Sequence, residues 1–122
     1  PESCLRPEHE LLLLCSRSVL STHQIARARY LILQNPDWTL LVRTARTHRV
    51  FPLLYKNLAH HFQSAVPGQI AADLKEQHLK NSAFNLFFSH QLLRLLSLLE
   101  AQQIKAVPFK GPVLAEYLYG DI

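Results

Sequence analysis

Three residue types are scarce or absent in this sequence, and each scarcity excludes a class of protein. With only 3 glycines in 122 residues, the chain has few flexible turns, which favours ordered and mostly helical structure over a loop-rich or disordered one. The 2 cysteines, Cys4 and Cys15, offer no framework of disulfides, so we expect a reducing, cytoplasmic location. Methionine is absent even at position 1, and we expect a trimmed or excised chain.

Long apolar runs and common catalytic signatures are missing as well. The apolar run at 11–15 is far shorter than the roughly 20 residues that cross a membrane, so we expect no membrane contact. No Walker loop, Ser/His/Asp constellation, zinc pattern or internal repeat is visible. Charged residues make up 18% of the sequence, which is low for a helical protein standing alone. We therefore expect part of the apolar surface to face polypeptide that is missing from this sequence.

The charges that are present favour an anionic partner over a cationic one. Net charge is +4, which by itself defines no activity. Arg43, Arg46 and Arg49 fall away from the apolar stripe of a predicted helix, where they either bind phosphates of a nucleotide or nucleic acid or are simply solvated. The adjacent His60 and His61 point to different sides of a helix, so we assign them no metal site.

Apolar residues recur at three- and four-residue spacing and predict five helices before residue 104. Ser21 or Thr22 caps the second helix, with Gln24 three residues beyond Ser21 as in a capping box, and Asp37 is a good cap for the next helix. The fifth helix is long, and its part from Leu92 to Leu99 is apolar almost all round, which predicts burial on several sides. The predicted helices run from Pro7 to about Arg17, from Ser21 to Asn35, from Asp37 to about His48, from Pro52 to about Phe62, and from about Gln69 to Ala101.

A different pattern begins at Ile104. The β-branched and aromatic residues of 104–109 predict a short buried strand, which enters a turn at Lys110-Gly111. Pro112 suits the first position of a sixth helix, and Gly120 is placed to end it. Backbone N–H groups at a helix start, together with the Lys110 ammonium, bind anions; alternatively, Gly111 merely permits a left-handed turn and Lys110 is solvated.

Two stretches resemble the predicted nucleotidyltransferase family, distant relatives of the DNA polymerase β superfamily. The run IKAVPFKGPVLAEYLYGDI resembles the family's strand that ends in Lys-Gly before a helix, and DWTLLVRTARTHRVFPLLYKNL resembles its helical region. The resemblance therefore spans about Asp37 to Ile122. It implies that Lys110 and Gly111 replace the superfamily's Gly-Ser turn and contact a nucleoside triphosphate.

The family's metal-binding motif is missing from these residues. The resemblance places an Asp-x-Asp on the next strand, after an Arg-containing loop, and the chain reaches Ile122 before it. Asp121 belongs to the preceding turn, so we assign no catalytic residue and no metal ligand. The resemblance implies Mg²⁺ and a nucleoside triphosphate for the intact protein, with neither tightly bound here.

We therefore expect a mainly α protein, a bundle of about six helices with one short C-terminal strand-turn-helix. It would be a fragment of an α+β nucleotidyltransferase-like protein, with a helical domain at 1–103 and the truncated start of the α/β core at 104–122. The implied activity is nucleotidyl transfer to an unknown acceptor, inactive in this fragment. The alternative is a noncatalytic helical binding module that uses its basic face.

The strand also predicts self-association. A lone strand leaves backbone N–H and C=O groups unpaired, so two copies are expected to associate through, or exchange, the C-terminal strand and helix. The residues expected to be buried in such a homodimer are Val107, Phe109, Leu114 and Tyr117.

Overall fold

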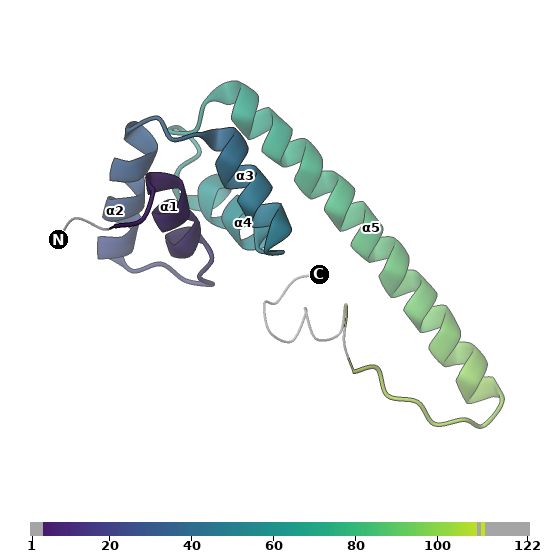
Figure 1. The fold of residues 1–122 in the computed structure, drawn as a ribbon. Helices are drawn as coiled ribbons and strands as arrows, with labels where there is room; N and C mark the ends of the chain where they lie inside the picture. The colour runs from purple at the N-terminus through teal and green to yellow at the C-terminus, as the bar shows by residue number, and fades with distance from the viewer. Residues whose placement is uncertain (1–3, 110, 112–122) are drawn as a thin grey trace. The chain divides into compact units, whose positions relative to one another are not determined.

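The computed structural model describes residues 4–109 and 111, and over these residues the chain forms five helices and no strand (Figure 1). The chain divides into two compact units, Pro1–Glu76 and Gln77–Ile122. The first contains four helices and the start of the fifth, and the second contains the rest of the fifth. The helices are α1 (Pro7–Cys15), α2 (Thr22–Leu33), α3 (Trp38–Thr47), α4 (Phe51–His61) and α5 (Gly68–Ala101).

The predicted caps at the starts of α2 and α3 are confirmed. The backbone N–H of Gln24 donates to Ser21 Oγ at 3.3 Å, and the backbone N–H of Ser21 donates to Gln24 Oε1 at 2.9 Å. At the next helix, the N–H of Leu40 donates to Asp37 Oδ1 at 3.0 Å. Because helix-start N–H groups have no partner within the helix, such a cap typically contributes about 1 kcal/mol.

Three helix ends have a residue other than glycine in the left-handed conformation. Asn35 follows α2 with φ 54°, Arg49 follows α3 with φ 59°, and Gln103 follows α5 with φ 60°. After α3 and α5, the N–H groups of this residue and of its successor donate back to helix carbonyls, as in a Schellman motif. These hydrogen bonds offset a conformational cost of roughly 1 kcal/mol or more per residue.

Helix α1 lies at the centre of the first unit and contacts α2, α3 and α4 (Figure 1). Its Leu11 and Cys15 side chains are fully buried. Each buried leucine stabilises the unit by about 1.5–3 kcal/mol relative to leaving it exposed. The core cluster consists of Leu11, Leu12, Cys15, Ala28, Leu31, Ile32, Trp38, Leu41, Ala45, Phe51, Leu54, Leu58, Phe62, Val66 and Leu74. The predicted apolar faces of α2 and α3 therefore do face the core.

A buried polar side chain joins α4 to the end of α1. Asn57 is 3% exposed, and its Nδ2 donates to the carbonyl oxygens of Cys15 and Arg17, both at 2.8 Å. The last carbonyls of a helix have no partner within it, so the Asn57 amide supplies what the end of α1 lacks. The sequence pattern did not indicate this role.

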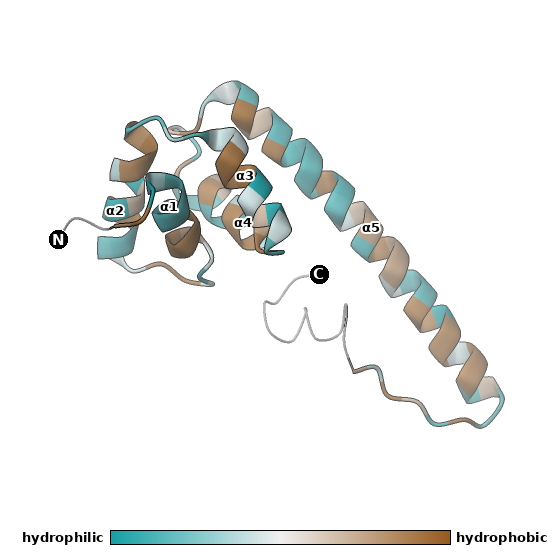
Figure 2. Ribbon diagram, viewed as in Figure 1, coloured by the Kyte–Doolittle hydropathy of each residue, from teal (hydrophilic) through white to brown (hydrophobic). Residues whose placement is uncertain are grey.

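The long helix predicted from about Gln69 to Ala101 is confirmed as α5. The predicted burial of its C-terminal half on several sides is not confirmed, because Leu93, Leu95 and Leu98 are 64%, 53% and 59% exposed. Figure 2 shows how many hydrophobic residues this part of the helix carries. Over the described residues, every helix is too short or too polar to cross a membrane.

The prediction of six helices with a C-terminal strand is wrong over the described residues, which form five helices and no strand. Residues 104–109 follow α5 without strand pairing to any other described residue, and Val107 and Phe109 are 89% and 82% exposed. A strand is stable only when its backbone groups find a neighbour, and Pro108 has no N–H to donate. The sixth helix predicted from Pro112 lies outside the described residues, and the boundary predicted after residue 103 stays a prediction.

Candidate functional site

The turn predicted to contact a triphosphate is described at Gly111, whereas Lys110 lies outside the described residues. Gly111 has φ +80°, a conformation that residues with a side chain rarely adopt. Among the described residues, no heavy atom lies within 4 Å of a Cβ added at this position. The φ of Gly111 therefore gives glycine a conformational role in the turn.

A hollow of about 510 Å³ lies between the end of α5 and the segment that follows it, within the second unit. It is lined by Leu96, Glu100, Gln103, Ile104, Lys105, Ala106 and Val107. The charges of Glu100 and Lys105 cancel, so the hollow by itself has no preference for a phosphate. The predicted anion site thus depends on Lys110 and the turn, not on this hollow.

The three arginines singled out in the sequence are all exposed. Arg43 and Arg46 lie on α3, and Arg49 follows its end. No carboxylate of the described residues forms an ion pair with any of them. Their positive charge is therefore available to an anionic partner, and it is equally compatible with a solvated surface.

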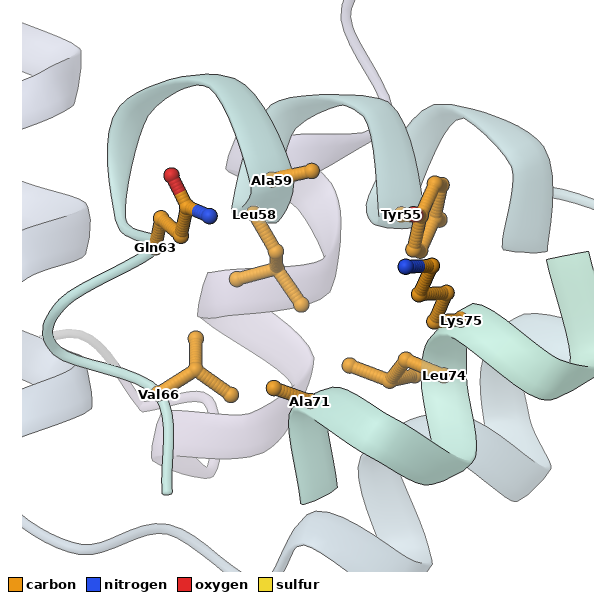
Figure 3. A pocket seen from close by; sticks show the side chains of 8 residues that line it. All are labelled: Tyr55, Leu58, Ala59, Gln63, Val66, Ala71, Leu74 and Lys75. Atoms are coloured by element: carbon orange, nitrogen blue, oxygen red, sulfur yellow. The ribbon is translucent and has the colours of Figure 1, made fainter. Parts of the chain in front are cut away.

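The sequence did not predict a pocket between α4 and the start of α5, which lies wholly within the first unit (Figure 3). Its volume is about 140 Å³, and its lining residues are Tyr55, Leu58, Ala59, Gln63, Val66, Ala71, Leu74 and Lys75. The walls are mostly apolar, while the Gln63 amide and the Lys75 ammonium supply polar groups (Figure 3). Such a pocket suits a small apolar group whose polar end reaches one of these two side chains.

Sequence periodicity could not have identified this pocket. Leu58 and Leu74 occupy ordinary apolar positions on two helices, and only their packing produces the concave surface. None of the residues predicted to contact a nucleotide lines it. The pocket and the three arginines belong to the first unit, whereas Gly111 belongs to the second.

The groups that commonly perform nucleophilic or metal chemistry are not arranged for it in the described part of the chain. Burial raises the pKa of the Cys15 thiol to about 12, which keeps it protonated at neutral pH. Burial and the neighbouring His60 lower the pKa of His61. Among the described residues, no group of three or more His, Cys, Asp and Glu side chains could hold a metal ion.

Comparison with known proteins gives one match. The profile of a family described as uncharacterised nucleotidyltransferase matches residues 34–122, which include α3, α4, α5 and the turn at Gly111. No curated protein and no solved structure matches the chain.

Proposed function

Because the chain belongs to the uncharacterised nucleotidyltransferase family, we propose that it takes part in moving a nucleotidyl group from a nucleoside triphosphate to an acceptor. The observation that carries this proposal is the extent of the family match, from residue 34 to residue 122. In this proposal, the Lys110 ammonium and the backbone N–H groups of the turn bind and orient the triphosphate. The φ of +80° at Gly111 supports a turn in which the backbone can approach a phosphate closely.

Mg²⁺ commonly supplies further charge stabilisation in reactions at phosphate. The described residues do not fit a Mg²⁺ site, since they contain no suitable group of ligands. The whole sequence also lacks an Asp-x-Asp motif. The resemblance to the family implies an Asp-x-Asp outside these residues, so we propose that the metal ligands come from that motif and that the turn at Lys110-Gly111 binds the triphosphate.

The first test measures transfer of a labelled nucleotide by a polypeptide in which these residues are joined to the part that carries the Asp-x-Asp. Lys110→Ala is expected to lower kcat/KM by about 100-fold, the typical effect of removing one donor to developing charge. Lys105→Ala is the matched control, because it removes the same charge five residues earlier on an exposed segment. Equal losses in the two variants, or none in Lys110→Ala, would contradict the proposal.

Residues 1–122 by themselves are expected to show no transfer and at most weak binding of nucleotide. One lysine and a few backbone donors lack the charge stabilisation that a metal and its carboxylates provide. Calorimetry with ATP and Mg²⁺ checks this expectation. Submicromolar binding that Lys110→Ala abolishes would show instead that the turn is a self-sufficient phosphate site.

A second function, noncatalytic binding of an anionic partner, is favoured by the exposure of Arg43, Arg46 and Arg49 without described ion pairs. Binding through these residues would weaken as salt concentration rises, because phosphate contacts release counterions. The test measures binding of a short RNA at several salt concentrations, before and after the three arginines are replaced by alanine. Salt-dependent binding that the replacement abolishes, without any transfer activity, would favour this function over the first.

A further inference from the structure

The C-terminal half of α5 exposes an apolar face that the proposed function does not use. Within the second unit, Phe84, Phe87 and Phe88 are 59%, 59% and 48% exposed. Leu95 and Leu98, farther along the same helix, are 53% and 59% exposed. Figure 2 shows this concentration of hydrophobic residues along the second half of the helix.

Exposed Phe88 and Leu95, together with the half-buried Leu92 and Leu99, have the spacing of a helix–helix seam. Phe88, Leu92, Leu95 and Leu99 follow one another at four-, three- and four-residue intervals, as the a and d positions of a heptad do. Asn85 holds the next position of the same seam toward the N-terminus. Residues at this spacing can pack against the ridge of another helix.

The size of the face is close to what a stable dimer needs. From the exposed fractions and the usual areas of these side chains, the three phenylalanines together with Leu95 and Leu98 expose about 600 Å². The largest apolar patch on a typical monomer is about 300–600 Å². A standard interface buries about 800 Å² on each partner, so a single helix-to-helix contact would use nearly the whole face.

The lack of charge on this part of α5 narrows the choice of partner. From Asn81 to Leu99, Arg94 is the only charged residue at neutral pH. A helix that lies on a membrane surface usually carries several Lys or Arg on its polar face, and a strongly charged protein would need opposite charges here. A second copy of the same face needs neither basic residues nor opposite charges on α5, because it is equally apolar and equally poor in charge.

We propose that two copies of this chain pack their α5 faces against each other around a two-fold axis. The contact buries Phe88, Leu92, Leu95 and Leu99 of both copies. A two-fold interface uses the same patch on each partner, so association through this seam closes at a dimer. This surface is distinct from residues 104–122, where pairing of a strand was predicted from the sequence.

Sedimentation equilibrium of the 122-residue chain, from low micromolar to about 100 µM, tests the proposal. The expected mass is twice the 14.0 kDa of one chain. Leu95→Glu is expected to raise the Kd about 100-fold or more, since each dimer would bury two unpaired carboxylates. Leu93→Glu is the matched control: Leu93 is 64% exposed and lies about 130° around the helix from the centre of the seam, so the Kd should not change.

Both variants place glutamate, a good helix former, at an exposed position, and circular dichroism is expected to show unchanged helix content. A wild-type chain that stays monomeric at about 100 µM overturns the proposal, including the case in which its own residues 112–122 cover the face. Equal weakening by Leu95→Glu and Leu93→Glu also overturns it. A dimer that resists Leu95→Glu but dissociates on Val107→Asp would place the interface on residues 104–109 instead.

Discussion

Replacing Asn57 by alanine should destabilise the first unit strongly, although the residue has no part in any proposed site. The Asn57 side chain is 3% exposed and donates at 2.8 Å to the carbonyl oxygens of both Cys15 and Arg17. Asn57→Ala removes both donors and leaves the two carbonyls without these partners. The main cost is the desolvation of the Cys15 carbonyl, whose hydrogen bond is buried, whereas Arg17 is exposed and water can reach its carbonyl.

The magnitude follows from the number of carbonyls left without a donor. The buried Cys15 carbonyl without a donor costs about 1–3 kcal/mol and the part-buried bond to Arg17 contributes about 0.5–1.5 kcal/mol, so Asn57→Ala should lower the free energy of unfolding by about 2–4 kcal/mol. A domain of the size of the first unit typically has about 4–11 kcal/mol in total. With a urea m-value near 1 kcal/mol/M, the midpoint should fall by about 2–4 M.

The assay is urea unfolding followed by the fluorescence of Trp38. This is the sole tryptophan, and it is buried in the core of the first unit, so its signal reports that unit. Gln34→Ala is the control, because Gln34 is an exposed amide whose removal should change stability by less than about 0.5 kcal/mol. A loss for Asn57→Ala no larger than that of the control would refute the reasoning.

Asn57→Asp separates loss of the donors from loss of volume. The shape is nearly the same, but an ionised carboxylate would place oxygen against the two carbonyl oxygens that now accept from Nδ2. Burial and this repulsion should raise the pKa of the new carboxyl in the folded state. Its stability should therefore be better retained at low pH and fall as pH rises through that raised pKa. A variant equally stable at both ends of the range would count against the role assigned to the amide.

Two further predictions concern titratable groups. The backbone N–H of Asp37 donates to Glu8 Oε1 at 2.8 Å and lowers the pKa of the Glu8 carboxyl. The stability that the ionised Glu8 adds is therefore present above the ordinary glutamate pKa of about 4.3. This stability is lost as pH falls through the lower pKa of the folded state. Urea midpoints measured from about pH 3 to 7 should thus show a weaker acid loss in Glu8→Gln than in wild type, and identical curves would contradict this. With a thiol reagent at neutral pH, the exposed Cys4 should react quickly, whereas Cys15, with its pKa raised to about 12 by burial, should react only after unfolding. Equal rates for the two thiols in the folded protein would show that Cys15 is accessible.

Local patterns in the sequence predict where the described helices lie, and its resemblance to known proteins predicts the family. The caps at Ser21 and Asp37 and the end of α2 just before Asn35 involve residues only a few positions apart, so local patterns predict them correctly. The family resemblance from about Asp37 to Ile122 agrees with the profile match at residues 34–122. Lys110 and Gly111 entered as site residues through that resemblance, and their contact with a nucleotide stays a prediction.

Packing between distant parts of the chain sets which apolar side chains are buried and which polar side chains form hydrogen bonds. Residues 104–109 have the composition of a strand, but a strand also requires a neighbour, and none is present among the described residues. Leu95 is as apolar as Leu74, yet it is 53% exposed and Leu74 is 3% exposed, because burial depends on what packs opposite. The role of Asn57 depends on contacts 40 and 42 residues away in the chain, a separation at which local patterns carry no information.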